Sequence, residues 1–131
     1  MEVKELLRVV GLSKGKLKPS EFRLREGEVG LSLFARTAHP SPDEVREAVR
    51  AAGKRGELAV AVLSVEQIGS LGLVLVQTPG GTPSPEVNAI HYEACLRWFR
   101  RLLLRLRGIG IHDYFNQELS PKLCEAARVL D

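Results

Sequence analysis

The sequence predicts an α+β fold, with a small mixed β-sheet, packed helices and a helical C-terminal third. The apolar runs Leu58–Leu63 and Leu73–Val76 are short enough to be buried strands. A helix-start pattern at Ser41 and helical apolar spacing after Asn88 indicate the helices. Strands followed by a helical end are typical of α+β domains.

The chain has 131 residues, of which 44% are apolar, and we expect one domain with one core. Residues 1–77 are expected to form its sheet-rich body and residues 88–131 its helical part. The segment between them, Thr78–Pro85, carries three prolines and two glycines, which predicts a loop. It is not a domain boundary, because the residues after it would make a poor core alone.

The N-terminal part predicts a strand and a hairpin. Leu6–Val10 is largely apolar and precedes a glycine, which favours a strand. Glu21–Arg25 and Gly30–Phe34 alternate polar and apolar residues, as half-buried hairpin strands do. The core candidates of this hairpin are Phe22, Leu24, Leu31 and Phe34.

The middle of the chain holds two helix-start signals. Ser41–Glu44 combines a serine cap, a proline at the first helical position and a glutamate at the third, which predicts a helix ending at Gly53. Ser64–Gln67 offers a second capping box and predicts a short helix between the two apolar strands. This short helix could form a compact crossover between the two apolar strands. However, the connection is shorter than parallel pairing of these strands usually requires.

Helical patterning begins at Asn88 and runs to Arg107, where glycines end it. A brief helix after Asp113 and a final helix from Ser120 complete the chain. In the final helix, the residues expected to face the core are Leu123, Cys124, Ala127 and Leu130.

The segment Leu96–Arg107 contains five arginines and no acidic residue. Since the whole chain carries a net charge of +3, the rest of it sums to −2, and the positive charge is local to this element. Helical spacing places Arg97, Arg101 and Arg105 in one row, with Arg100 beside them. The binding candidates of the segment are Arg97, Arg100, Arg101, Arg105, Arg107 and Trp98. The opposing apolar row, expected to tie the helix to the body, is Leu96, Phe99, Leu103 and Leu106.

Three interpretations of this helix stay open. Its arginines dock phosphates, a nucleic-acid backbone or an acidic protein surface through bidentate contacts. Alternatively, they form a solvated face that pairs with acids elsewhere in the fold. The third interpretation is a helix lying in a membrane interface, with Trp98 beside the arginines.

Asn88–Cys95 gathers residue types that support acid/base chemistry at a loop-to-helix junction. The catalytic candidates are His91, Glu93 and Tyr92, although His91 and Glu93 would point apart on a helix. The alternative is that Asn88 caps the helix and His91 hydrogen-bonds within the core or at its rim. His91 and Cys95 have metal-compatible spacing, but the other ligands follow no zinc pattern, and we predict no metal and no cofactor.

Charged residues interrupt the N-terminus and the longest apolar stretch, which argues against a signal peptide and a membrane-spanning helix. We therefore expect a cytoplasmic protein. Its two cysteines, Cys95 and Cys124, fit buried thiols in a reducing compartment better than a disulfide.

In chain order, Leu6–Val10, Phe22, Gly30–Phe34, Leu71–Leu73 and Asn88–His91 form an LLRVV…F…GLSLF…LGL…NAIH pattern. This pattern resembles a group of small bacterial α+β proteins of uncharacterised function. The resemblance covers about the first 95 residues and stops before the arginine helix. It implies a compact α+β body and no particular activity.

Our first hypothesis is a small intracellular binding module that docks an acidic protein or nucleic acid through the arginine helix. By analogy of size, we expect a component of a bacterial toxin–antitoxin or defence operon, forming a homo- or hetero-oligomer. The alternative is a small enzyme acting on a nucleotide or phosphate-bearing substrate, with His91 as acid/base and Arg97 holding the anion.

Overall fold

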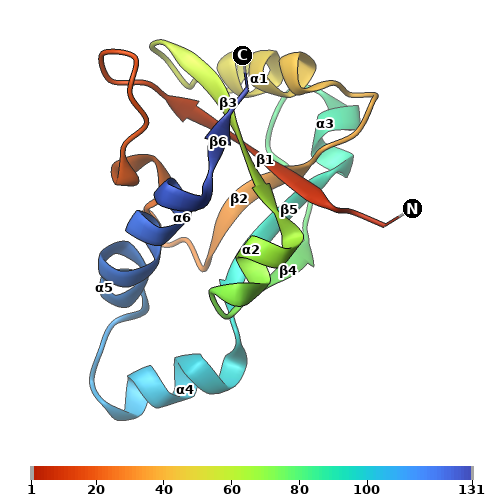
Figure 1. Ribbon diagram of the computed structural model, residues 1–131. Helices are drawn as coiled ribbons and strands as arrows, with labels where there is room; N and C mark the ends of the chain where they lie inside the picture. Colours follow the sequence, from red (N-terminus) through yellow and green to blue (C-terminus); the bar gives the residue numbers. More distant parts are fainter. Residues whose placement is uncertain (1, 131) are drawn as a thin grey trace.

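The computed structural model describes residues 2–130, and it has the α+β fold that the sequence predicts. Six strands form one sheet in the order β4-β5-β2-β1-β3-β6 (Figure 1). All neighbouring strands are antiparallel, whereas the sequence suggested a mixed sheet. The strands are β1 (Glu5–Gly11), β2 (Gly30–Ala35), β3 (Leu58–Ser64), β4 (Leu73–Gln77), β5 (His91–Leu96) and β6 (Arg128–Val129).

Helical segments cover both faces of this sheet. They are η1 (Pro19–Phe22), α1 (Pro42–Ala51), α2 (Val65–Ser70), α3 (Pro85–Ala89), α4 (Trp98–Leu106), α5 (Ile111–Tyr114), the π-helical η2 (Phe115–Leu119) and α6 (Ser120–Ala126). The last three follow one another without a break and form the predicted helical end.

The expectation of a single core is wrong, since two cores lie on opposite faces of the sheet. Both form because successive side chains of a strand point in opposite directions. Leu6 and Val10 of β1 belong to the larger core, with side chains from η1, α2, η2 and α6. Leu7 and Val9 belong to the smaller core, under α1 and α3. The buried run Leu58–Leu63 in β3 supplies both cores, as its unbroken apolar sequence predicted.

The first arm of the predicted hairpin is not a strand. Pro19 opens the short 3-10 helix η1, and Leu24 follows in an irregular segment. The Asn116 side chain accepts a hydrogen bond from Leu24 N at 2.8 Å and donates one to Leu24 O at 3.2 Å. This amide occupies the backbone groups that a partner strand would otherwise bind. Phe22 and Leu24 are nevertheless buried, as are Leu31 and Phe34.

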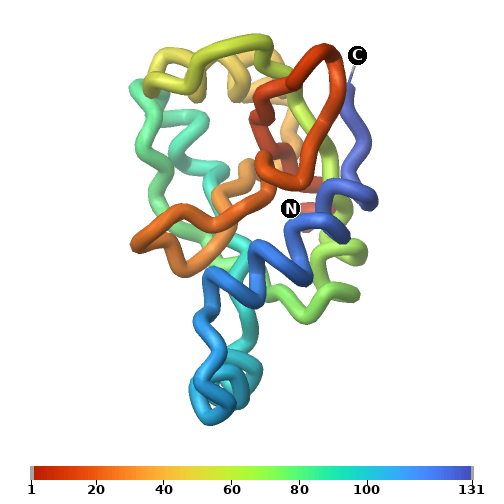
Figure 2. Tube along the Cα trace, turned by 90° about the vertical axis from the view of Figure 1, so that its left-hand side faces the viewer, coloured from red at the N-terminus to blue at the C-terminus, as the bar shows by residue number. Residues whose placement is uncertain are grey.

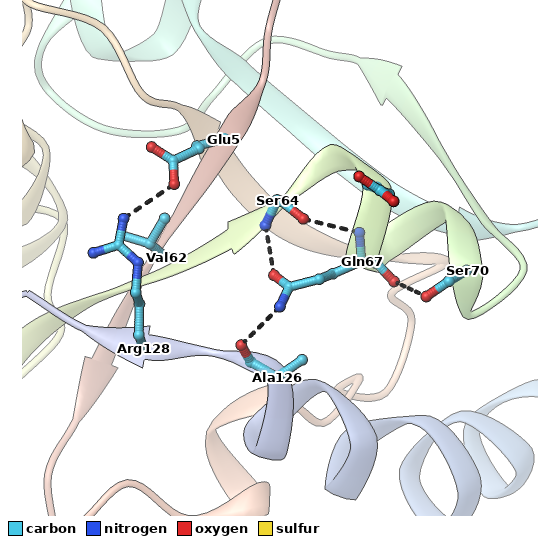
Figure 3. A pocket seen from close by; sticks show the side chains of 8 residues that line it. Glu5, Val62, Ser64, Gln67, Ser70, Ala126 and Arg128 are labelled. Carbon is cyan, nitrogen blue, oxygen red and sulfur yellow. Dashed lines mark hydrogen bonds and ion pairs between the residues drawn. The ribbon is translucent and has the colours of Figure 1, made fainter.

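Both predicted capping boxes are present. In α1, Glu44 N donates to Ser41 Oγ at 3.3 Å, and Ser41 N donates to Glu44 Oε1 at 3.2 Å. Ser64 and Gln67 repeat this arrangement at the start of α2 (Figure 3). Gln67 Nε2 also donates to Ala126 O at 3.2 Å, so the cap of α2 holds the end of α6 in place.

The sheet curls around the larger core. Helix α2 contacts both β3 and β4, although β5, β2 and β1 lie between these two strands in the sheet. Helix α2 is too short a connection to make β3 and β4 parallel neighbours. It can still join them, because the curvature of the sheet brings these two strands to either side of α2. Within residues 2–130, no helix is long and apolar enough to cross a membrane.

Candidate functional site

The prediction of one continuous helix from Asn88 to Arg107 is wrong, since this stretch forms a helix, a strand and a second helix. Helix α3 ends at Ala89, β5 spans His91–Leu96, and α4 begins at Trp98. Ladders with β2 on one side and β4 on the other hold β5 in the sheet. Tertiary hydrogen bonds outweigh a helical preference that is weak in a short segment.

Helix α4 projects from the body at the end furthest from α1, and both views show it standing apart from the sheet (Figures 1 and 2). Leu104 is its one buried residue, at 5% exposure. Arg100 adds a contact with the body, because its guanidinium carbon lies 5.9 Å from the centroid of the Tyr114 ring.

The apolar row expected to tie this helix to the body does not do so. Leu96 is buried, but it belongs to β5. The exposed apolar side chains of α4 and its following loop are Trp98, Phe99, Leu102, Leu103, Leu106 and Ile109. Trp98 and Leu106 are exposed at 70% and 74%, so the apolar face of α4 points to solvent. An exposed cluster of this kind marks an interaction surface more often than a scattered apolar residue does.

Side chains four residues apart share a face, which gives α4 four rows. In order around the helix, the rows are Arg97-Arg101-Arg105, Trp98-Leu102-Leu106, Phe99-Leu103-Arg107 and Arg100-Leu104. The apolar residues of the second and third rows are adjacent, with arginines of the other two rows on both sides of them and Arg107 at the end of the third row. We call this surface, with its apolar centre and cationic borders, the α4 face.

The arginines of the α4 face are not neutralised within the fold. None of the five takes part in an ion pair within 4.0 Å among residues 2–130. The interpretation of a solvated face paired with acids elsewhere therefore finds no partner in the described chain. Next to Trp98 and Leu102, a hollow of about 690 Å³ also includes Arg101, Arg105 and Ile109 in its wall.

His91 lies on β5 and not on a helix, and it is buried at 7% exposure. Its Nε2 is 2.6 Å from Ser32 Oγ, and its Nδ1 is 3.0 Å from Thr78 Oγ1 and 3.1 Å from Thr78 O. A carbonyl oxygen only accepts hydrogen bonds, so this contact favours the tautomer with the proton on Nδ1. In that tautomer Ser32 donates its hydroxyl proton towards Nε2, which places a hydroxyl against a base.

The other two catalytic candidates occupy opposite faces of β5. Glu93 shares the face of His91, because residues two apart in a strand point the same way, and it lies opposite Ser32 in the ladder. Tyr92 points to the other face and packs against the larger core. The structure brings His91 together with Ser32 and not with Tyr92.

An ordered loop holds Thr78 against His91. Asn88 does not cap a helix here, since Ser84 caps α3. Its side-chain Oδ1 accepts from Thr82 N at 2.8 Å, and its Nδ2 donates to Thr82 O at 2.8 Å. A Cβ on Gly80 would lie 2.9 Å from Asn88 Oδ1, so the loop needs glycine there to pack this closely. The proline- and glycine-rich segment Thr78–Pro85 thus positions Thr78 to hydrogen-bond the imidazole of His91.

Three residues at this site, Arg8, Ser32 and Thr78, were not singled out from the sequence. Arg8 and Ser32 each interrupt an otherwise apolar strand, which is a detectable signal of a polar group in a buried setting. Thr78 carries no such signal, because its role depends on the path of the loop. Arg8 donates from Nε to Glu21 O and from Nη1 to Ser32 O, both at 2.7 Å.

Other parts of the described chain offer weaker sites. A cavity of about 400 Å³ between the end of β3, α2 and the start of β6 is lined by polar groups that largely bond one another, including Glu5 with Arg128 at 3.1 Å (Figure 3). No group of three or more His, Cys, Asp or Glu residues within 2–130 could hold a metal ion. Cys95 and Cys124 are free and partly buried, and burial raises the pKa of both thiols.

Comparisons of this chain with protein-family models, with curated proteins and with solved structures find no match.

Proposed function

We propose that this protein is a binding module that docks its α4 face into an apolar groove with acidic borders on a partner protein. The observation that carries the proposal is the exposure of two adjacent apolar rows between arginines on both sides. Helices that bind in grooves present anchors at this spacing. Trp98, at 70% exposure, is the strongest anchor, because tryptophan and arginine dominate interface energies.

A partner protein accounts for more of this surface than nucleic acid does. Phosphates would bind the arginines but leave the exposed leucines and Phe99 uncovered. A second copy is disfavoured, because each copy would bring five arginines and no acid to the contact. An acidic partner from the same toxin–antitoxin or defence operon is the setting that we propose for the module.

The test is purification of the tagged protein from its native host, with co-eluting molecules identified at low and high salt. We expect a protein that stays bound to the wild type and is lost from the double variant Leu102→Glu/Leu106→Glu. Trp98→Ala should weaken the purified pair at least about tenfold, equivalent to about 1.4 kcal/mol. Arg101→Gln/Arg105→Gln should lower the association rate and its salt dependence.

Val29→Glu is the matched control, since Val29 is also apolar and 58% exposed but lies outside α4. It should leave binding unchanged. Retention of the partner by Leu102→Glu/Leu106→Glu would exclude the α4 face as the docking surface. If a nucleic acid co-elutes instead, is released by salt and still binds the variant Leu102→Glu/Leu106→Glu, the partner is a nucleic acid and not a protein.

A second candidate function is an enzyme acting on a nucleotide or phosphate-bearing substrate, with His91 as acid/base. The 2.6 Å contact between Ser32 Oγ and His91 Nε2, with Nδ1 held by Thr78, favours it. Its test is turnover of a panel of nucleoside phosphates, followed by ³¹P NMR. His91→Gln and Ser32→Ala should abolish turnover and Glu86→Gln should not. Turnover that survives His91→Gln would leave the imidazole with a structural role only.

A further inference from the structure

The two central strands of the sheet separate after a short ladder. β1 pairs with β2 only at Leu6 with Ala35 and Leu7 with Phe34, although β1 continues to Gly11. Beyond that point the Arg8 side chain bridges the gap, with its hydrogen bonds to the carbonyls of Ser32 and Glu21. A guanidinium thus replaces the missing backbone pairing, and a pocket opens beside it.

This pocket, which we call the β1–β2 pocket, has a volume of about 630 Å³, which suits a ligand of nucleotide size. Four cationic side chains line it, and they are Arg8, Arg25, Lys54 and Arg55. Two carboxylates, Glu21 and Glu28, also line it and leave a net charge of +2. The chain outside the arginine helix sums to −2, so this pocket is positive against the trend of the body.

Among the described residues, neither carboxylate forms an ion pair within 4.0 Å with a guanidinium of the pocket, although both lie near enough to Arg8 to raise its pKa. Glu21 is engaged by Lys54 Nζ at 3.1 Å and by Gly11 N at 2.6 Å. Glu28 accepts from Arg25 N at 2.6 Å. Arg8, Arg25 and Arg55 make no ion pair within 4.0 Å among the residues that the structure describes.

The guanidinium of Arg8 is desolvated in this arrangement. Burial lowers the pKa of its guanidinium more than the nearby Glu28 and Glu21 raise it, the charge of Arg25 adds to the lowering, and the resulting pKa is about 10. A desolvated cation without a paired acid is destabilising, and a bound anion would remove that cost. Two guanidiniums that face one pocket can hold a phosphate through bidentate hydrogen bonds.

The remaining walls suit the rest of such a ligand. Ser32, whose hydroxyl contacts His91, lines the pocket on the polar side. Val9, Phe34 and Val49 supply an apolar side, where a ring could pack.

We propose that the β1–β2 pocket binds a small phosphate monoester, with its phosphate held by Arg8, Arg25 and Arg55 and its organic part against Val9, Phe34 and Val49. This site rests on the second candidate function and extends it, because it places a phosphate-bearing molecule beside Ser32, whose hydroxyl contacts His91 behind the pocket wall. It is independent of the α4 face.

The experiment is a titration of the full chain with a nucleoside 5′-monophosphate, followed by amide NMR shifts and calorimetry. The matched ligands are the nucleoside without phosphate and inorganic phosphate. We expect the monophosphate to shift signals of β1, η1 and the residues after α1. The nucleoside should bind at least about tenfold more weakly, as loss of charge-assisted hydrogen bonds implies.

The variants separate this pocket from other basic surfaces. Arg25→Gln/Arg55→Gln removes two exposed cations without disturbing the backbone bonds of Arg8, and it should weaken binding at least about tenfold. Arg50→Gln on α1 and Arg101→Gln/Arg105→Gln on α4 should bind as the wild type does. Arg8→Lys keeps the charge but loses the bridging geometry, and it should bind more weakly than the wild type.

The outcomes are distinct. Absence of binding at millimolar ligand, unchanged affinity in Arg25→Gln/Arg55→Gln, or shifts confined to α4 would each overturn the assignment of the pocket. Binding without turnover of any nucleoside phosphate upholds the pocket and rejects the enzyme. Binding with turnover that depends on His91 upholds both.

Discussion

β5 and α4 follow one another directly in the chain, yet they use their apolar residues in opposite ways. Alternate residues of β5 enter the larger core, and His91 on its other face has hydrogen-bond partners at both ring nitrogens. α4 has a strong helical pattern but buries Leu104 alone. The comparison teaches that an amphipathic pattern identifies a face and does not say whether the protein's own core or a partner covers it.

The sharpest test of this difference compares Leu96 and Leu106, which the sequence placed in the same apolar row of one long helix. Leu96→Ala, in β5, should cost about 3 kcal/mol of unfolding free energy, because the residue is buried and leaves a cavity. Leu106→Ala, in α4, should change stability by less than about 0.5 kcal/mol. Urea denaturation of both variants measures the contrast. Equal losses would mean that α4 packs against the body after all.

Leu104 links the two regions, and its removal should have the next largest effect. Leu104→Ala should cost about 2 kcal/mol, since the side chain is almost fully buried at the edge of the larger core. Amide hydrogen exchange in α4 should accelerate in this variant, while exchange in β5 should not change. Leu102→Ala serves as the exposed control on the same helix. Unaltered exchange in α4 would show that another contact holds the helix.

Close packing against β5 gives a smaller expected effect. A Cβ on Gly30 would lie 2.5 Å from Cys95 Sγ, so Gly30→Ala should destabilise the protein by about 1.5 kcal/mol. Cys95→Ala removes the sulfur, and the double variant should recover part of the loss in a thermodynamic cycle. Strict additivity of the two substitutions would place the strain elsewhere, for instance at the backbone of β5.

The smallest effect is a pH dependence at Glu21. Burial alone would raise the pKa of this carboxyl, but hydrogen bonds from Gly11 N and Lys54 Nζ and the nearby cations lower it. A lowered pKa in the folded state contributes stability above the ordinary glutamate pKa of about 4.3 and loses it as pH falls through the folded value. The stability gap between wild type and Glu21→Gln should therefore shrink on acidification. Glu118→Gln, at an exposed site on η2, is the control, and a gap that stays constant would contradict the lowered pKa.

The sequence by itself determined the α+β class, the positions of strands β1 to β4, both capping boxes and the burial of the hairpin side chains. These features depend on local rules, namely alternation in strands, serine caps and glycine stops. β5 also alternates polar and apolar residues, with His91, Glu93 and Cys95 on one face, but a helix fitted this segment as well without knowledge of its neighbouring strands. The two-residue strand β6 is too short to leave a pattern in the sequence.

Only the tertiary structure decided which faces are covered and which polar groups meet. Ser32, Thr78 and His91 come from three separate segments, and the gap beside Arg8 exists because β1 and β2 diverge. The exposure of the α4 face likewise depends on how the chain leaves β5. Contacts between residues distant in sequence follow from strand order and sheet curvature, which no local pattern encodes.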